Sequence, residues 1–249
     1  MPRLSVLTIT YNEEKNIADC LESVRWADEV IVVDSGSNDR TVEIARCYTD
    51  KILQVEWRGY GASRNSALAV ATGDWVLWLD ADERVPDDLA REIAEVMRSE
   101  NGRHNAYDVA RRAYFLGRWI RHAGWYPSRI VRLFRRRCGT FNDSRVHEQL
   151  LIDGSVGSLQ HDLIHYTDPD LRHYFDKFNR YTTLAAEDMH AAGRKFRIPD
   201  IFVRPAFIFF KMYILRLGFL DGMQGLILSA VSSAYVFTKY AKLWEIRNQ

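Results

Sequence analysis

Two aspartates, Asp80 and Asp82, stand two residues apart directly after residues 75–79, which are apolar throughout. A turn at this point can bring both carboxylates to one divalent cation, or to a ribose and a cation together. Mg²⁺ and Mn²⁺ prefer oxygen ligands and often take only one or two from a protein, leaving diphosphate and water to supply the rest. A solvated acidic turn before a helix, with Glu83 as part of it, is the alternative.

Polar residues also follow two earlier apolar segments. Thr10 and Tyr11 come after residues 4–9, Asp34 ends the segment 29–34, and Ser35 follows it. The Asp34 carboxylate can accept a hydrogen bond from a base or a ribose, and Tyr11 can stack on a base. The alternative is that Asp34 only satisfies a turn and caps the next helix.

The segments that must position these side chains alternate in type. Short apolar stretches at 4–9, 29–34, 52–55 and 75–79 predict strands, and amphipathic stretches after Asn12, at 41–47, at 63–71 and after Pro86 predict helices. Asn12 is expected to cap the first helix. This alternation predicts an α/β fold with a mainly parallel sheet covered on both faces, which binds ligands outside the carboxyl ends of its strands.

The same residues carry a resemblance to a known family. Thr-Tyr-Asn-Glu at 10–13, Val-Asp-Ser-Gly-Ser at 33–37 and Leu-Asp-Ala-Asp-Glu at 79–83 resemble family 2 glycosyltransferases of the Rossmann-like GT-A fold. Segments at 26–30, 64–65, 124–127, 132–134 and 146–148 resemble its lipopolysaccharide core β-1,4-glucosyltransferase branch. The resemblance covers about the first 170 residues well, and the tail more weakly.

The resemblance implies roles for particular residues. Tyr11, Asp34 and Arg64 would hold the nucleotide, Asp80 would face the ribose, and Asp82 would bind Mg²⁺ or Mn²⁺. The implied substrate-binding set is completed by neighbours of these residues and by one histidine: Thr10, Glu13, Ser35, Ala81 and His147. A structural hydrogen-bonding role is an equal alternative for His147.

Glu148, in Val-His-Glu, is the expected general base, because the family places an acidic residue well after the metal motif. An inverting transfer needs one carboxylate to take the proton of the acceptor hydroxyl. Asp143 is a competing base, and an ion pair with Arg145 is a competing role for Glu148.

Basic residues are concentrated in two places. Residues 111–137 contain nine arginines and no acidic residue, interleaved with aromatic residues. This composition favours binding of phosphate-bearing sugars, with a solvated face as the alternative. A second basic segment, 194–216, is mixed with Phe and Ile, and residues 219–240 are apolar and helical in pattern.

We therefore expect a GT-A domain at 1–170 and a helical extension at 171–249 that docks on the inner-membrane surface without crossing it. A buried helix pair is the alternative. The net charge of +1 argues against a nucleic-acid partner, and the three cysteines lack metal-ligand spacing. With no secretory signal evident, the expected location is cytoplasmic, peripheral on the cytoplasmic face of the inner membrane.

The expected activity is inverting transfer of a hexose, from UDP-glucose, to a lipid-linked lipopolysaccharide or lipooligosaccharide core. Transfer to polyprenyl phosphate or a peptide is an alternative. A nucleotidyltransferase is a rival enzyme, but it would need a basic, glycine-rich phosphate loop near the N-terminus, whereas residues 8–15 are acidic. A catalytically silent carbohydrate-binding protein with the same fold is the rival from another class.

Overall fold

The computed structural model describes residues 1–57, 59–99, 104–142 and 149–248. The chain divides into two compact units. The first unit comprises residues 1–111 and 129–165, and the second comprises residues 112–128 and 166–249. The second unit thus combines the expected C-terminal extension with two segments that precede it in the sequence.

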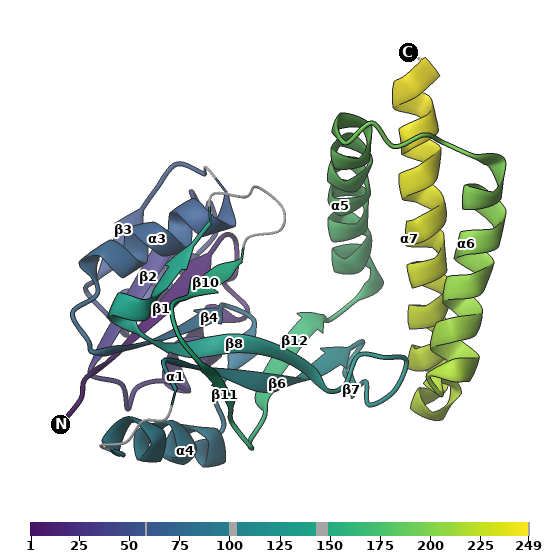
Figure 1. Ribbon diagram of the computed structural model, residues 1–249. Helices are drawn as coiled ribbons and strands as arrows, with labels where there is room; N and C mark the ends of the chain where they lie inside the picture. The colour runs from purple at the N-terminus through teal and green to yellow at the C-terminus, as the bar shows by residue number, and fades with distance from the viewer. Residues whose placement is uncertain (58, 100–103, 143–148, 249) are drawn as a thin grey trace. The chain divides into compact units, whose positions relative to one another are not determined.

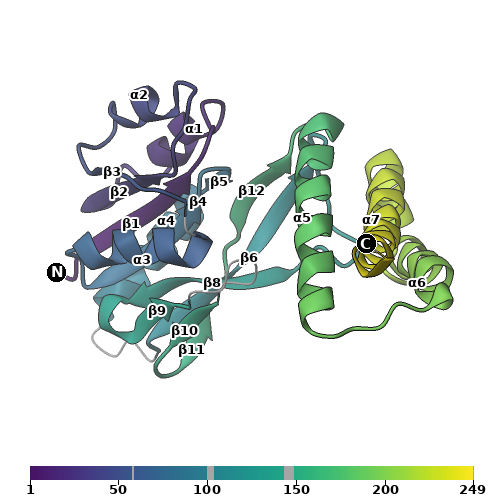
Figure 2. The ribbon, with the colours of Figure 1, turned by 90° about the horizontal axis from the view of Figure 1, so that it is seen from above.

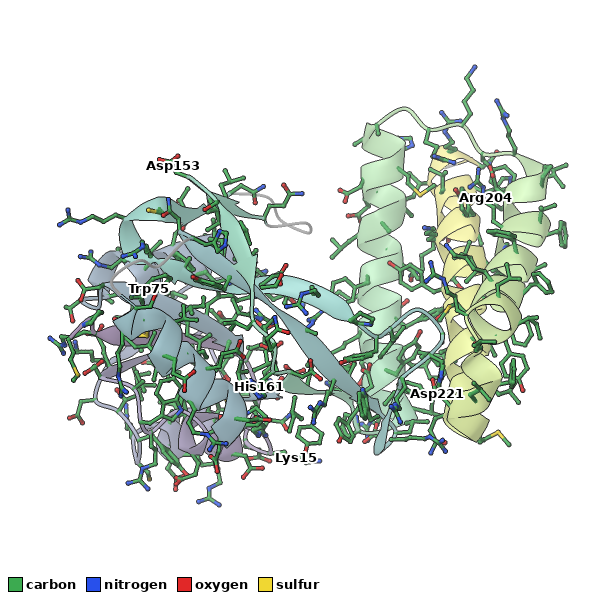
Figure 3. The ribbon with its side chains drawn as sticks, turned by 60° about the horizontal axis from the view of Figure 1, so that its bottom comes forward. Lys15, Trp75, Asp153, His161, Arg204 and Asp221 are labelled. Carbon is green, nitrogen blue, oxygen red and sulfur yellow. The ribbon has the colours of Figure 1, made fainter. Side chains whose placement is uncertain are left out.

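Four parallel strands form the centre of the first unit (Figure 1). They are β1 (Leu4–Thr10), β2 (Glu29–Asp34), β3 (Ile52–Gln54) and β4 (Trp75–Asp80), in the spatial order β3-β2-β1-β4. Trp75, labelled in Figure 3, is almost fully buried in this sheet. The residues are apolar on both strand faces, which suits a parallel sheet with helices on each side.

The sheet continues beyond β4 with strands of mixed direction. Its order runs β4-β8-β6-β12-β5, with β8 antiparallel to β4 and β12 antiparallel to β5. The bounds of these and the remaining short strands are β5 (Glu83–Arg84), β6 (Ala106–Phe115), β7 (Arg118–Trp119), β8 (Ser128–Arg135), β11 (Val156–Ser158) and β12 (Leu163–Asp168). A separate antiparallel pair joins β9 (Gly139–Phe141) to β10 (Leu150–Ile152). The expected mainly parallel α/β sheet is confirmed, with this mixed half added to it.

Helices cover both faces of the central strands, as predicted. Leu4 and Val6 of β1 point into a core shared with α1 (Ile17–Glu22) and α4 (Asp87–Arg98). Leu7, on the opposite face, packs in a core with α3 (Tyr60–Val70). A shorter helix, α2 (Thr41–Ala45), follows β2.

Asn12 does not cap α1, so that expectation is wrong. The helix begins at Ile17, and its N-cap position is Asn16. Asn12 adopts a left-handed conformation, with φ of 55°, and its Oδ1 accepts a hydrogen bond from the Asn38 backbone N–H at 2.9 Å. Its side chain therefore joins the loops after β1 and β2 instead of ending a helix.

The second unit is mainly helical, as expected for the C-terminal part. Its long helices are α5 (Leu171–Ala191), α6 (Ile198–Phe210) and α7 (Gly222–Asn248), which lie side by side in Figures 1 and 2. A π-helical turn (Lys211–Leu215) and a 3₁₀ turn (Gly218–Asp221) connect α6 to α7. Phe115, Ile120 and Ala123, from the earlier segment of this unit, pack against Leu228 of α7.

Among the described residues, no single helix has both the length and the apolar character that a membrane crossing requires. Residues 198–215 and 218–248 meet those criteria only when they are taken together, and they are bent by 72° at the break between them.

Candidate active site

The polar ends of three strands meet at one edge of the first unit's sheet. Thr10 of β1 lies opposite Asp34 of β2, and Ile9 lies opposite Asp80 of β4. The chain passes from β1 outward to β2 and β3, then returns to place β4 on the other side of β1. Such a reversal leaves a crevice at the carboxyl ends of the strands, where α/β sheets bind ligands.

Asp80 is held by two arginines at this edge. Its Oδ1 accepts a hydrogen bond from Arg64 Nη2 of α3, and its Oδ2 accepts one from Arg132 Nη2 of β8, both at 2.8 Å. Burial raises the pKa of the Asp80 carboxyl, but the charges of Arg132 and Arg64 lower it by more, to well below the usual range. Asp80 is therefore an anion at neutral pH, with about a third of its side chain (31%) exposed.

Trp78 supports both arginines from the same strand as Asp80. The guanidinium carbon of Arg132 lies 3.6 Å from the Trp78 ring centroid, and that of Arg64 lies 4.0 Å from it. The Trp78 Nε1 donates to the Val131 carbonyl at 2.8 Å, which fixes the ring. Cation–π contacts of this kind are strongest when desolvated, and Arg132 is fully buried.

Glu83 is fully buried beside Arg132 and is not part of a solvated turn. Its Oε1 accepts from Arg132 Nη2, and its Oε2 accepts from the Asp80 backbone N–H at 3.0 Å. Burial raises the pKa of Glu83, and the charge of Asp80 raises it further, although Arg132 opposes both. Glu83 thereby fixes the backbone on which Asp80 and Asp82 stand.

Asp82 faces a histidine of β12. His165 Nε2 of β12 lies 3.4 Å from Asp82 Oδ2, and both side chains are largely buried. Burial lowers the pKa of His165, but the hydrogen bond and charge of Asp82 raise it by more. Asp82 offers a carboxylate oxygen, the ligand type that Mg²⁺ and Mn²⁺ prefer, and His165 stands beside it with a nitrogen.

No group of three or more acidic, histidine or cysteine side chains gathers as a metal cage within the described parts of the chain. Mg²⁺ seldom uses such a cage, since it keeps waters and shares ligands with phosphates. A site with only one or two protein ligands, Asp82 among them, is therefore compatible with a cation that is bound together with a diphosphate.

The residues expected around the nucleotide lie close by, and several are engaged in loop contacts. Asp34 accepts from the Gly36 and Ser37 backbone N–H groups, both at 3.1 Å, as the turn alternative predicts. The Ser35 N–H donates to the Thr10 carbonyl at 3.1 Å. These contacts order the loop and leave the nucleotide role of Asp34 a prediction.

The other expected residues differ in exposure. Tyr11 is 55% exposed and available for stacking, whereas Ala81 is buried and can offer a ligand only its backbone. The Glu13 Oε2 accepts from Asn16 Nδ2 at 2.8 Å. His147 and Glu148 lie outside the described residues, as do Asp143 and Arg145.

The arginine-rich segment does not form one surface. Arg132 is buried against Asp80 and Glu83, and Arg129 Nε donates to Asp108 Oδ1 at 2.6 Å. Arg112 and Arg121 belong to the second unit, where both approach the Trp119 ring. The segment itself contains no acidic residue, and the carboxylates that pair with its arginines come from distant strands. Phosphate binding by the segment as a whole stays a prediction.

Residues 5–151 match the model of glycosyl transferase family 2. The chain belongs to this family. It is therefore a glycosyltransferase, as the strand-end motifs predicted, and its fold is GT-A. Membership of this enzyme family disfavours both rival functions, a nucleotidyltransferase and a catalytically silent carbohydrate-binding protein.

Named relatives of this glycosyltransferase extend over nearly the whole chain. It is 29% identical to "Lipopolysaccharide core biosynthesis glycosyltransferase LpsC" of Rhizobium meliloti, over 97% of this chain and 92% of that protein. It is also 29% identical to an uncharacterised glycosyltransferase of Rickettsia typhi, over 99% of this chain and 88% of the relative.

A solved structure shares the fold of this glycosyltransferase. The mannosyltransferase PcManGT of Pyrobaculum calidifontis, in complex with GDP-Man and Mn²⁺, superposes with a TM-score of 0.56 at 19% identity. The match covers 98% of this chain and 87% of that one. At this identity the likeness supports the GT-A fold alone.

Proposed function

We propose that this glycosyltransferase moves a hexose, with inversion, from UDP-glucose to a lipid-linked lipopolysaccharide or lipooligosaccharide core. The observation that carries the proposal is the Asp80–Arg64–Arg132 arrangement beside Asp82 at the sheet's switch point. The name of the Rhizobium meliloti relative supports the acceptor class.

The donor nucleotide binds over the carboxyl ends of β1, β2 and β4. Tyr11 stacks on the base, and Asp34 accepts a hydrogen bond from the nucleoside. Asp80 accepts from a ribose hydroxyl through its exposed portion, because both arginines keep it ionised. Arg64 and Arg132 leave Asp80 little freedom to turn, so the ribose is met by a fixed acceptor.

Asp82 and His165 would hold Mg²⁺ or Mn²⁺ at this site. Such a cation would supply charge neutralisation for the departing diphosphate. Glu148 takes the proton of the attacking acceptor hydroxyl.

The second unit brings the protein to its lipid-linked acceptor at the cytoplasmic face of the inner membrane. α6 carries large apolar side chains that are more than half exposed, at Ile198, Phe202, Val203 and Phe207. A buried helix pair would cover such residues. Exposed apolar residues beside cations are typical of helices that bind membrane interfaces without crossing them.

The proposal is tested with the full chain, a core oligosaccharide acceptor and a panel of UDP-glucose, UDP-galactose and GDP-mannose. Mass spectrometry should detect hexose transfer from UDP-glucose in Mn²⁺, and transfer should stop in chelator. Asp82→Ala should abolish transfer with the fold intact, whereas Asp153→Ala, at another carboxylate on the first unit, should not. Wild-type turnover that persists in chelator, together with an active Asp82→Ala variant, would remove the metal role. A protein that no nucleotide stabilises against heat would remove the donor proposal.

A further inference from the structure

Three cations of the second unit surround one tyrosine. The guanidinium carbons of Arg194 and Arg204 lie 5.7 and 5.5 Å from the Tyr240 ring centroid, and Lys239 Nζ lies 5.7 Å from it. They come from the loop after α5, from α6 and from α7, so the packing of the helices assembles the cluster. Arg204 is labelled in Figure 3, where it lies on α6 beside α7.

Positive charge exceeds negative charge in this cluster. The buried Asp200 carboxylate accepts from Arg204 Nε one helical turn away. Burial lowers the pKa of Lys239, and the charges of Arg194 and Arg204 lower it further. The three cations therefore repel one another at a place where an anion would offset the repulsion.

The cluster suits a phosphate in particular. A guanidinium presents paired N–H donors that match two phosphate oxygens, and an ammonium adds a point charge with three donors. Arg194 is exposed at the surface, and Lys239 is only partly covered, so an incoming group can reach both.

The helix that carries Arg204 also exposes apolar side chains. Ile198, Phe202 and Val203 of the same helix as Arg204 are 70%, 68% and 63% exposed. A free phosphate would make no contact with these apolar side chains, whereas a phospholipid brings acyl chains with its headgroup.

We propose that Arg194, Arg204 and Lys239 form a binding site for the phosphate of an anionic phospholipid headgroup. This inference rests on the proposal that the protein works at a membrane surface.

Vesicle binding tests the site. The full chain is mixed with phosphatidylcholine vesicles with and without phosphatidylglycerol, and bound protein is measured by flotation. A cluster variant, Arg194→Gln with Lys239→Gln, is compared with a control variant, Arg172→Gln with Arg247→Gln, which loses the same charge elsewhere on the second unit. Basic residues at an anionic surface contribute about fivefold each, so the cluster variant should bind roughly 25-fold more weakly and the control far less so.

Direct titration identifies the source of the phosphate. Dihexanoyl phosphatidylglycerol, below its micelle concentration, should raise the melting temperature of the wild type but not of the cluster variant. Inorganic phosphate at the same concentration should have a smaller effect. An equal or larger effect of inorganic phosphate would overturn the headgroup assignment. The single variant Arg194→Gln, at an exposed loop position, provides the same comparison should the double variant unfold.

The outcomes separate this site from the wider proposal. Equal vesicle binding by the cluster and control variants would overturn the site while leaving membrane binding in place. Failure of the wild-type protein to bind anionic vesicles would overturn membrane docking together with the site. Donor-induced stabilisation of the first unit should be the same in all variants, and it reports on nucleotide binding separately.

Discussion

The Arg132 guanidinium lies 3.6 Å from the Trp78 ring centroid while it bonds to Asp80, two residues along the same strand as Trp78. One buried cation thus contacts both a ring and a carboxylate of β4. Because Arg132 also bonds to Glu83, it joins β8 to both ends of the acidic motif. The position of Asp80 therefore depends on a residue 52 positions away in the sequence.

Replacing Arg132 should destabilise the protein. Arg132→Gln leaves the buried Glu83 without its main cation, and breaking a buried ion pair costs about 3–5 kcal/mol of unfolding free energy. Urea unfolding measures this loss. Adding Glu83→Gln should restore part of it, whereas the control Arg137→Gln, at an exposed position, should change stability by less than about 0.5 kcal/mol. Equal stability of Arg132→Gln and Arg137→Gln would contradict the role.

His165 should contribute to metal affinity. Because His165 contacts Asp82 at the proposed cation site, His165→Gln should weaken Mn²⁺ binding in the presence of UDP by roughly 10- to 100-fold. Electron paramagnetic resonance of free Mn²⁺ measures the affinity. His161→Gln is the control, because His161 Nδ1 pairs with Glu92 at 2.8 Å and not with Asp82. The same Mn²⁺ affinity in both variants would exclude His165 from the site.

Glu148→Gln should lower the catalytic rate by roughly 10²-fold or more with donor affinity little changed, because the change keeps the side chain's shape and removes its basicity. Steady-state transfer and UDP titration separate the two effects. Asp143→Asn is the matched comparison, since Asp143 is the competing base. A slow Asp143→Asn variant beside an active Glu148→Gln variant would move the role to Asp143.

Glu29 should make stability depend on acid pH. Burial raises the pKa of Glu29, but hydrogen bonds from Lys51, Ser5 and Thr72 lower it by more, from 4.5 to about 2. A depressed carboxyl pKa contributes stability that is present above pH 4.5 and is lost as the pH falls toward 2. Urea midpoints of the wild type should fall across this window, and those of Glu29→Gln should fall less. Parallel curves would show that Glu29 is not the titrating group.

Exposed aromatic residues of α6 should contribute to membrane binding. Phe202→Ser with Phe207→Ser should weaken vesicle binding at least about tenfold, since burying one such side chain is worth roughly 1.5–3 kcal/mol. The melting temperature should change little, because both rings are exposed. Val70→Ser with Leu151→Ser, at exposed positions of the first unit, serves as the control. Flotation that is unaffected by the α6 changes would leave these rings without a membrane role.

The local sequence pattern was sufficient to predict the central strands and the edge of the sheet where polar residues gather. Apolar runs ending in Thr10, Asp34 and Asp80 predicted three strand ends at one place, and the strand register confirms it. The helix start was wrong at Asn12, because a turn shared with the Asn38 loop outcompeted capping. That competition depends on a loop 26 residues away.

The sequence could not predict which side chains pair with residues far away along the chain. Arg132 was part of a noted motif, yet nothing local showed that it would be buried against Glu83, 49 positions earlier. His165 had no metal-ligand spacing to Asp82, because its position comes from β12 reaching β5 across the sheet. The arginine run looked unpaired for the same reason, since its carboxylates belong to other strands.

The two units share strands. β6 (Ala106–Phe115) and β12 (Leu163–Asp168) each begin in the first unit and end in the second. A chain truncated near residue 170 would keep Phe115 and Ile120 but lose the Leu228 that packs against them, leaving apolar side chains open to aggregation. A chimera that borrows the helical part of another family member must therefore exchange residues 112–128 along with it.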